Sequence, residues 1–136
     1  MKKGTIFSLV LFCSILMNCS EKYKNMPEGC VVINELLPVN TSVMADQNGE
    51  YDDWIELYNK CSLDLDLSGY YLSDNKSKTG KWQIPEGTTI GANSYLIFWA
   101  DGDTTQTGLH CNFKLSSDGE NLYFSNPEKL IIDEIE

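Results

Sequence analysis

The feature that most limits how this chain can fold is a two-residue alternation of apolar and polar side chains in short segments. The segment "WIELYN" runs from Trp54 to Asn59, and in a strand its successive side chains point to opposite faces. Ile55 and Leu57 then share one face, which is expected to enter a core. Other short strand-like segments are separated by glycine, asparagine and aspartate. No segment after Gly29 has a helical apolar period, so the sequence predicts an all-β domain, a sandwich or a barrel.

The predicted strands are rich in β-branched and aromatic residues and end at turn-forming residues. The segment Tyr95–Ala100 is nearly continuously apolar, as expected for a strand covered on both faces. Residues 109–126 are interpreted as two strands joined by a hairpin turn at Ser117–Glu120. The other predicted strands are Cys30–Leu37, Trp54–Asn59, Leu63–Leu67, Gly69–Asp74, Lys81–Pro85 and a last one beginning at Lys129.

The start of the chain does not follow this pattern. After a short basic beginning, Gly4–Met17 is an apolar run about as long as a signal-peptide core and too short for a permanent membrane span. It ends in "LMNC", which resembles a bacterial lipobox, where the cysteine is lipidated. We therefore expect a lipoprotein signal peptide over residues 1–18, lipidation at Cys19 and a polar tether over residues 19–29. An ordinary secretory signal is the alternative.

This beginning of the chain predicts a location outside the cytoplasm. The lipid would anchor it to a bacterial membrane, at the outer membrane or the cell surface. After Cys19 the chain has eight lysines, no arginine and all 20 acidic residues, a side-chain charge of −12. Nucleic-acid binding usually needs clusters of basic residues, so no nucleic-acid partner is expected.

Three of the five cysteines remain available for the folded domain. Cys13 leaves with the signal peptide and Cys19 carries the lipid, which leaves Cys30, Cys61 and Cys111. One disulfide and one free thiol are the natural expectation for an exported domain. If the strands before and after the long loop pair antiparallel, Cys30 and Cys61 lie near the same end of the pair. Of the three pairings the sequence favours Cys30–Cys61, with Cys111 free.

At this point five motifs resemble a known family. Segments in the order "VVINELLP", "DDWIELYN", "LDLSGYYLSD", "KWQIPEGTTIGANSYLIFWADG" and "NFKLSSDGENLYF" are similar to the lamin tail domain as it occurs in bacteria, from about Val31 to the C-terminus. The resemblance implies an immunoglobulin-like β-sandwich over residues 30–136. Family members usually continue beyond the "IID" strand, so the sandwich could lack its last strand.

Four carboxylates near the long loop could act in catalysis. Glu35, Asp52, Asp53 and Glu56 would suit acid–base glycoside hydrolysis if two of them lay about 5–9.5 Å apart. We expect instead that these acids accept hydrogen bonds from backbone N–H groups of turns. His110 is expected to be a surface histidine on a strand. The chain is therefore predicted not to be an enzyme.

Oxygen-bearing side chains at alternate positions of the long loop suggest a second interpretation of its acids, namely a calcium site. The spacing does not fit an EF-hand loop, so no cofactor is expected and Ca²⁺ is kept only as an alternative. The candidates are Asp46, Asn48, Asp52 and Asp53, with further oxygen from Glu50, Asp101 and Asp103.

Aromatic rings on a sheet face could stack on a sugar or bind a protein. Most of them are expected to fill the core or cover the sheet. Trp54 and Tyr58 are the first candidates for a ligand face, because they lie opposite Ile55 and Leu57. The full aromatic set is Trp54, Tyr58, Tyr70, Tyr71, Trp82, Tyr95 and Trp99.

These observations predict a non-enzymatic binding or scaffold module at the cell surface. It would be held to the membrane by a lipid and would bind a polysaccharide or a protein, or position a fused domain. The alternative is the N-terminal accessory domain of a larger extracellular enzyme. The resemblance implies this alternative, because bacterial members commonly sit beside nucleases, phosphatases or spore-coat H-type kinases.

Overall fold

The computed structural model describes residues 26–119 and 121–136. The predicted signal peptide, Cys13, Cys19 and the first part of the predicted tether lie outside the described residues. Within the described part, no helix is long and apolar enough to cross a membrane. The described end of the tether contacts the domain, because the half-buried Met26 packs against the core and Cys30 N donates to Pro27 O at 3.1 Å.

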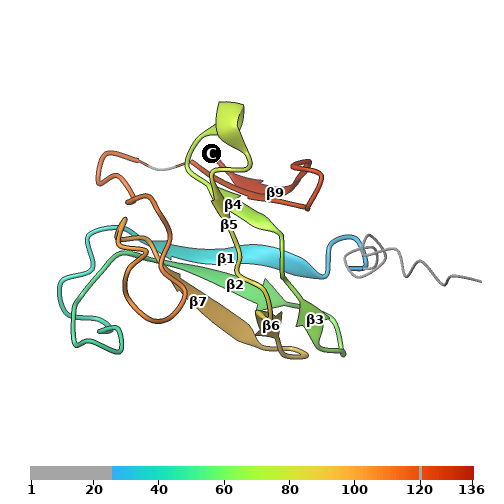
Figure 1. Cartoon of the computed structure of the whole chain (residues 1–136), viewed down its shortest axis with the longest axis horizontal. Coiled ribbons are helices and arrows are strands. Elements are labelled where there is room, and N and C mark those ends of the chain that lie inside the picture. The colour runs from blue at the N-terminus through green and yellow to red at the C-terminus, as the bar shows by residue number, and fades with distance from the viewer. Residues whose placement is uncertain (1–25, 120) are drawn as a thin grey trace, which may run out of the picture.

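One layer of the fold is an antiparallel three-stranded sheet with β2 in its centre (Figure 1). Its strands are β1 (Val31–Leu37), β2 (Trp54–Asn59) and β7 (Tyr95–Trp99). The register between β1 and β2 shifts between Ile33 and Glu35, which marks a β-bulge. Both edges of β2 are therefore hydrogen-bonded, and its register is specified from two sides.

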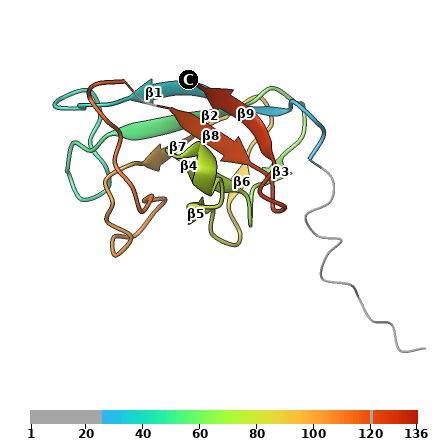
Figure 2. The same ribbon diagram turned by 90° about the horizontal axis from the view of Figure 1, so that it is seen from above.

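The second layer is a four-stranded antiparallel sheet in the order β5-β4-β8-β9 (Figures 1 and 2). Ile33 N in the first layer donates to Asp133 Oδ2 in β9 at 2.7 Å, which joins the two layers at one edge. The strands of this layer are β4 (Tyr71–Ser73), β5 (Trp82–Gln83), β8 (Leu122–Ser125) and β9 (Ile131–Ile135). A separate small sheet pairs β3 (Leu65–Asp66) with β6 (Thr89–Ile90). The segment η2 (Lys76–Lys78) is a 3₁₀ turn.

The core lies between the two layers. Ile55 and Leu57 are fully buried in it, as the alternation in β2 predicts. Phe98 of β7 meets Trp82 of β5 edge-on, with ring centroids 5.9 Å apart, and so connects the layers. Burying each large apolar side chain contributes about 1.5–3 kcal/mol. The predicted all-β sandwich is confirmed.

A disulfide and a buried amide side chain hold the turns at the end of β2 that carries Asn59. Cys30 and Cys61 form a disulfide with a Cα–Cα distance of 5.3 Å, and Cys111 is buried and free. The fully buried Asn59 side chain donates to Leu63 O at 2.8 Å and to Gly91 O at 2.9 Å. These contacts bind the turn after β2 and the turn between β6 and β7 to the strand end.

Three predictions of local structure were wrong. Residues 109–126 do not form a hairpin: only isolated bridges occur in the first half, while β8 pairs with β4 and β9. Tyr95–Ala100 is not covered on both faces, since Tyr95 is 56 % exposed. The strand predicted over Leu63–Leu67 is reduced to Leu65–Asp66, and Leu63 is exposed. Glu120, in the predicted turn, lies outside the described residues.

The disulfide is expected to stabilise the domain by restricting the unfolded chain. Its sequence separation of 31 residues corresponds to about 3–4 kcal/mol on the chain-entropy model. The double variant Cys30→Ala/Cys61→Ala should lose about that much free energy of unfolding in urea titrations. A reducing agent should lower the stability of the wild type and leave the double variant unchanged; equal stability of both proteins before reduction would contradict the prediction.

Candidate functional site

Two long loops meet at the end of the three-stranded sheet where β2 begins. Residues 38–53 connect β1 to β2, and residues 100–121 connect β7 to β8. Because β2 runs antiparallel to both neighbours, Leu37, Trp54 and Trp99 are in register at this end. Figure 1 shows both loops on the same side of the molecule. The antiparallel topology thus brings together polar residues that are far apart in the sequence.

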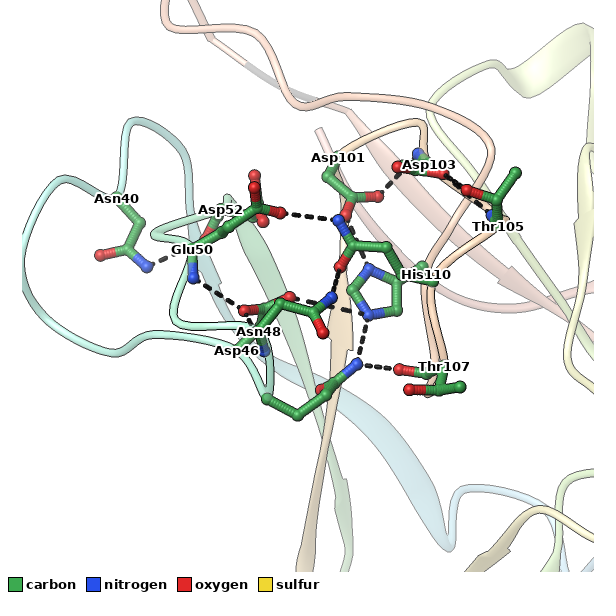
Figure 3. Close-up of polar contacts among 12 residues, drawn as sticks. Asn40, Asp46, Asn48, Glu50, Asp52, Asp101, Asp103, Thr105, Thr107 and His110 are labelled. Carbon is green, nitrogen blue, oxygen red and sulfur yellow. Dashed lines mark hydrogen bonds and ion pairs between the residues drawn. The ribbon is translucent and has the colours of Figure 1, made fainter.

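His110 joins the two loops and is buried, with 3 % of its surface exposed. Its Nδ1 lies 2.6 Å from Asp101 Oδ2, and its Nε2 lies 2.8 Å from Gln47 Nε2 (Figure 3). Gln47 Nε2 also donates to the carbonyl of Thr107, so His110 Nε2 accepts and Nδ1–H donates to Asp101. The prediction of a surface histidine was wrong: His110 is a buried connector between loops.

Asp46 organises the turn in the first loop. Its Oδ1 accepts from the backbone N–H groups of Asn48 and Glu50, both at 2.8 Å. Asp46 N donates to Glu50 O at 2.8 Å, and Gly49 takes a φ of 85°, which favours glycine. This local geometry turns the chain so that one carboxylate oxygen each of Asp46, Glu50 and Asp52 lies within 4.8 Å of the other two. We call these three residues the carboxylate cluster.

Three negative charges in the carboxylate cluster would repel one another. Burial raises the pKa of the Asp52 carboxyl, and the charges of Asp101, Glu50 and Asp46 raise it further; only a protonated, positively charged His110 would oppose them. Asp46 Oδ2 and Asp52 Oδ2 are both buried and have no hydrogen-bond partner. Buried oxygen atoms without a donor are uncommon in proteins and require an explanation.

The remaining oxygen-bearing candidates are engaged in hydrogen bonds with other groups. Asp53 Oδ1 accepts from Asn40 N at 3.1 Å, and the side chain of Asn48 donates to Gln106. Asp101 holds His110, and Asp103 Oδ1 accepts from Thr105 N at 2.9 Å. Of the calcium candidates, the structure therefore brings together only Asp46 and Asp52, with Glu50 as the third member.

The four acids considered for catalysis are divided between two places. Glu35 and Glu56 are cross-strand partners in the first sheet, and Glu56 Oε1 accepts from Asn34 Nδ2 at 2.7 Å. Asp52 and Asp53 lie in the loop before β2. A cavity of about 340 Å³ lies elsewhere, between residues 26–31, Tyr70 and the turn after β8, and none of the four acids lines it.

The outer face of the first sheet has a buried end and an open end. Trp54 and Trp99 are cross-strand partners, 6 % and 8 % exposed, so Trp54 offers little surface to a ligand. Tyr58 stacks on Tyr95 with ring centroids 4.5 Å apart and an interplanar angle of 24°. Tyr95 is 56 % exposed and Tyr58 is half-buried. We call Tyr58 and Tyr95 the tyrosine pair. The sequence pattern indicated Tyr58 as a first candidate but not Tyr95. An antiparallel pairing of the two strands that contain them would have placed the two rings side by side.

The other aromatic candidates have structural positions. Tyr70 and Trp82 belong to the core, where Tyr70 stacks on Phe124 at 5.6 Å. Tyr71 is half-buried beneath Lys129, whose Nζ lies 5.7 Å from the ring centroid. The tyrosine pair is therefore the part of the predicted aromatic set that presents ring surface on the first sheet.

The geometry describes an immunoglobulin-like β-sandwich with two long loops gathered at one end (Figure 1). Residues 24–136 match the family model of the lamin tail domain, and the chain belongs to that family. The predicted fold class and the predicted family are thus confirmed. No curated protein matches the chain.

Removing the His110 side chain should loosen the junction of the two loops. His110→Ala leaves Asp101 Oδ2 without its hydrogen-bond partner in a buried place, which should lower the free energy of unfolding by about 1–3 kcal/mol. Thr104→Ala, an exposed change in the same loop, should alter it by less than about 0.5 kcal/mol. Urea unfolding followed by tryptophan fluorescence measures both; equal effects would refute a structural role for His110.

Proposed function

We propose that this lamin tail domain is the non-enzymatic binding module of an exported bacterial lipoprotein, and that it holds a polysaccharide at the cell surface through the tyrosine pair. The observation that carries the proposal is the stacked, partly exposed arrangement of Tyr58 and Tyr95 on the outer face of the first sheet. Family membership supports a binding role, because the family consists of immunoglobulin-like, non-catalytic domains.

The tyrosine pair suits a sugar ring because it combines flat apolar surface with polar groups. Stacked aromatic rings offer an apolar face at low conformational cost. Glu56 lies between the two ends of β2 on the same face, and its carboxylate is already oriented by Asn34. The many acidic residues of the chain repel anionic polymers, so a neutral polysaccharide is the ligand class we propose.

Export is supported by the disulfide between Cys30 and Cys61. Disulfides persist in oxidising compartments outside the cytoplasm and are rare within it. The apolar run at residues 4–17 followed by "LMNC" supports a lipid anchor at Cys19. A tether after Cys19 would leave the sheet face free to meet a surface polymer.

Removal of either ring should weaken polysaccharide binding. Tyr58→Ala and Tyr95→Ala each delete one half of the stacked surface, and each should weaken binding about tenfold, equivalent to about 1.4 kcal/mol. Affinity electrophoresis in gels containing neutral polysaccharides measures the change.

Tyr51→Ala is the matched control, because Tyr51 is 50 % exposed in a loop and has no stacking partner among the described ring pairs. It should bind like the wild type. If Tyr51→Ala weakens binding as much as Tyr95→Ala, or if only a protein and no polysaccharide binds the wild type, the proposed ligand class is wrong.

The lipid anchor is tested separately. Cys19→Ala removes the thiol that would carry the lipid, so the protein should move from the membrane fraction to the soluble fraction. Cell fractionation with immunoblotting measures the distribution, and Cys13→Ala serves as the control that should remain in the membrane. An unchanged membrane fraction for Cys19→Ala would contradict the anchor.

A further inference from the structure

The carboxylate cluster combines the close approach of three carboxylates with the burial of two of their oxygen atoms, Asp46 Oδ2 and Asp52 Oδ2. Asp46, Glu50 and Asp52 come from one loop and each places a carboxylate oxygen within 4.8 Å of the other two. Figure 3 shows this loop facing Asp101 and His110 on the second loop. Like charges at such a distance repel one another, and the repulsion grows as water is excluded.

A second observation is independent of the clustering. The Asp46 side chain is completely buried, with 0 % of its surface exposed, yet its Oδ2 accepts no hydrogen bond. Asp52 Oδ2 is likewise buried and without a donor. Leaving a buried charged oxygen without a hydrogen-bond partner is strongly unfavourable. Both oxygen atoms therefore have the environment of cation ligands rather than of surface acids.

Neighbouring side chains do not neutralise these oxygen atoms. His110 Nε2 lies 4.0 Å from Asp46 Oδ2, but this nitrogen accepts from Gln47 and has no proton to give. Among the ion pairs of the described residues, no lysine pairs with any member of the carboxylate cluster. Only Glu50 has a side-chain donor, Gln106 Nε2 at 2.6 Å from its Oε2.

We propose that Asp46, Glu50 and Asp52 bind one Ca²⁺ ion. Three carboxylates form a hard, all-oxygen ligand set, which favours Ca²⁺ or Mg²⁺ over zinc and other metals that prefer nitrogen or sulfur. Ca²⁺ takes roughly six to eight oxygen ligands in irregular geometry, so water can complete the shell. Ca²⁺ suits this loop better than Mg²⁺, which requires a compact octahedron and retains its water.

Bound Ca²⁺ would tie the two loops together. Glu50 accepts from Gln106, and Gln47 donates to Thr107, so the first loop already contacts the second through residues beside the cluster. Fixing the three carboxylates on one ion would hold these contacts in place. This role is independent of the tyrosine pair and of polysaccharide binding.

The test is a titration of the detergent-solubilised full chain with Ca²⁺ after treatment with EDTA. Because Ca²⁺ binds only the folded loop, the Tm should rise by about 4–10 °C at 10 mM Ca²⁺, with a dissociation constant near those of extracellular modules, about 10⁻⁴–10⁻³ M. Isothermal titration calorimetry with CaCl₂ measures the dissociation constant directly.

Three variants locate the site. Asp46→Asn keeps an oxygen for the N–H groups of Asn48 and Glu50 but removes the charge, and Asp52→Asn and Glu50→Gln each remove one charge. Each should weaken Ca²⁺ binding at least tenfold. Glu50 is exposed, so Glu50→Gln keeps the test decisive if Asp46→Asn does not fold. Asp118→Asn removes an exposed charge from another loop and should bind Ca²⁺ normally.

Several outcomes would overturn the proposal. The wild type could show no Tm shift up to 10 mM Ca²⁺, or NaCl at matched ionic strength could produce the same shift. Loss of the shift in Asp118→Asn equal to that in Asp52→Asn would show that net charge alone is responsible. An equal shift with Mg²⁺ would overturn the assignment to Ca²⁺.

Discussion

The structure depends on the central position of β2 in the first sheet. Its two edges are hydrogen-bonded to β1 and β7, and its inner side chains, Ile55 and Leu57, are fully buried. A one-residue slip would turn both side chains to the outer face and expose them. The same strand sets the outer face, because Tyr58 can stack on Tyr95 only in the observed register.

Buried polar side chains explain why the loops around β2 are ordered. Asn59 Nδ2 donates to two turn carbonyls while its Oδ1 accepts from Cys61 N at 3.0 Å. At the other end, Asn40 donates to Met44 O at 2.6 Å and to Asp52 O at 2.9 Å. Each amide replaces hydrogen bonds that the loop backbone would otherwise make to water. Long loops with so many internal bonds can hold carboxylates close together in spite of their repulsion.

Local sequence pattern predicts strands and faces well but not their long-range partners. The alternation in β2 is sufficient to predict that Ile55 and Leu57 enter the core. Residues 109–126 look like a hairpin because two apolar runs flank a glycine, yet Leu72 in β4, not the preceding run, pairs with Phe124. The burial of His110 has no local signal, because it depends on Gln47, which lies 63 residues away in the sequence. The carboxylate cluster was partly predictable, since its three members belong to one loop.

The two candidate regions lie at opposite ends of one strand. Trp54 and Tyr58 are four residues apart on the same face of β2, which corresponds to about 13 Å at the rise of a β-strand. The carboxylate cluster precedes Trp54, and the tyrosine pair begins at Tyr58. Sites separated by more than about 7–10 Å without shared partners usually contribute independently. A cation at the loops would therefore stabilise the end of the sandwich without being required for binding at the tyrosine pair, so substitutions in the two regions should have additive effects.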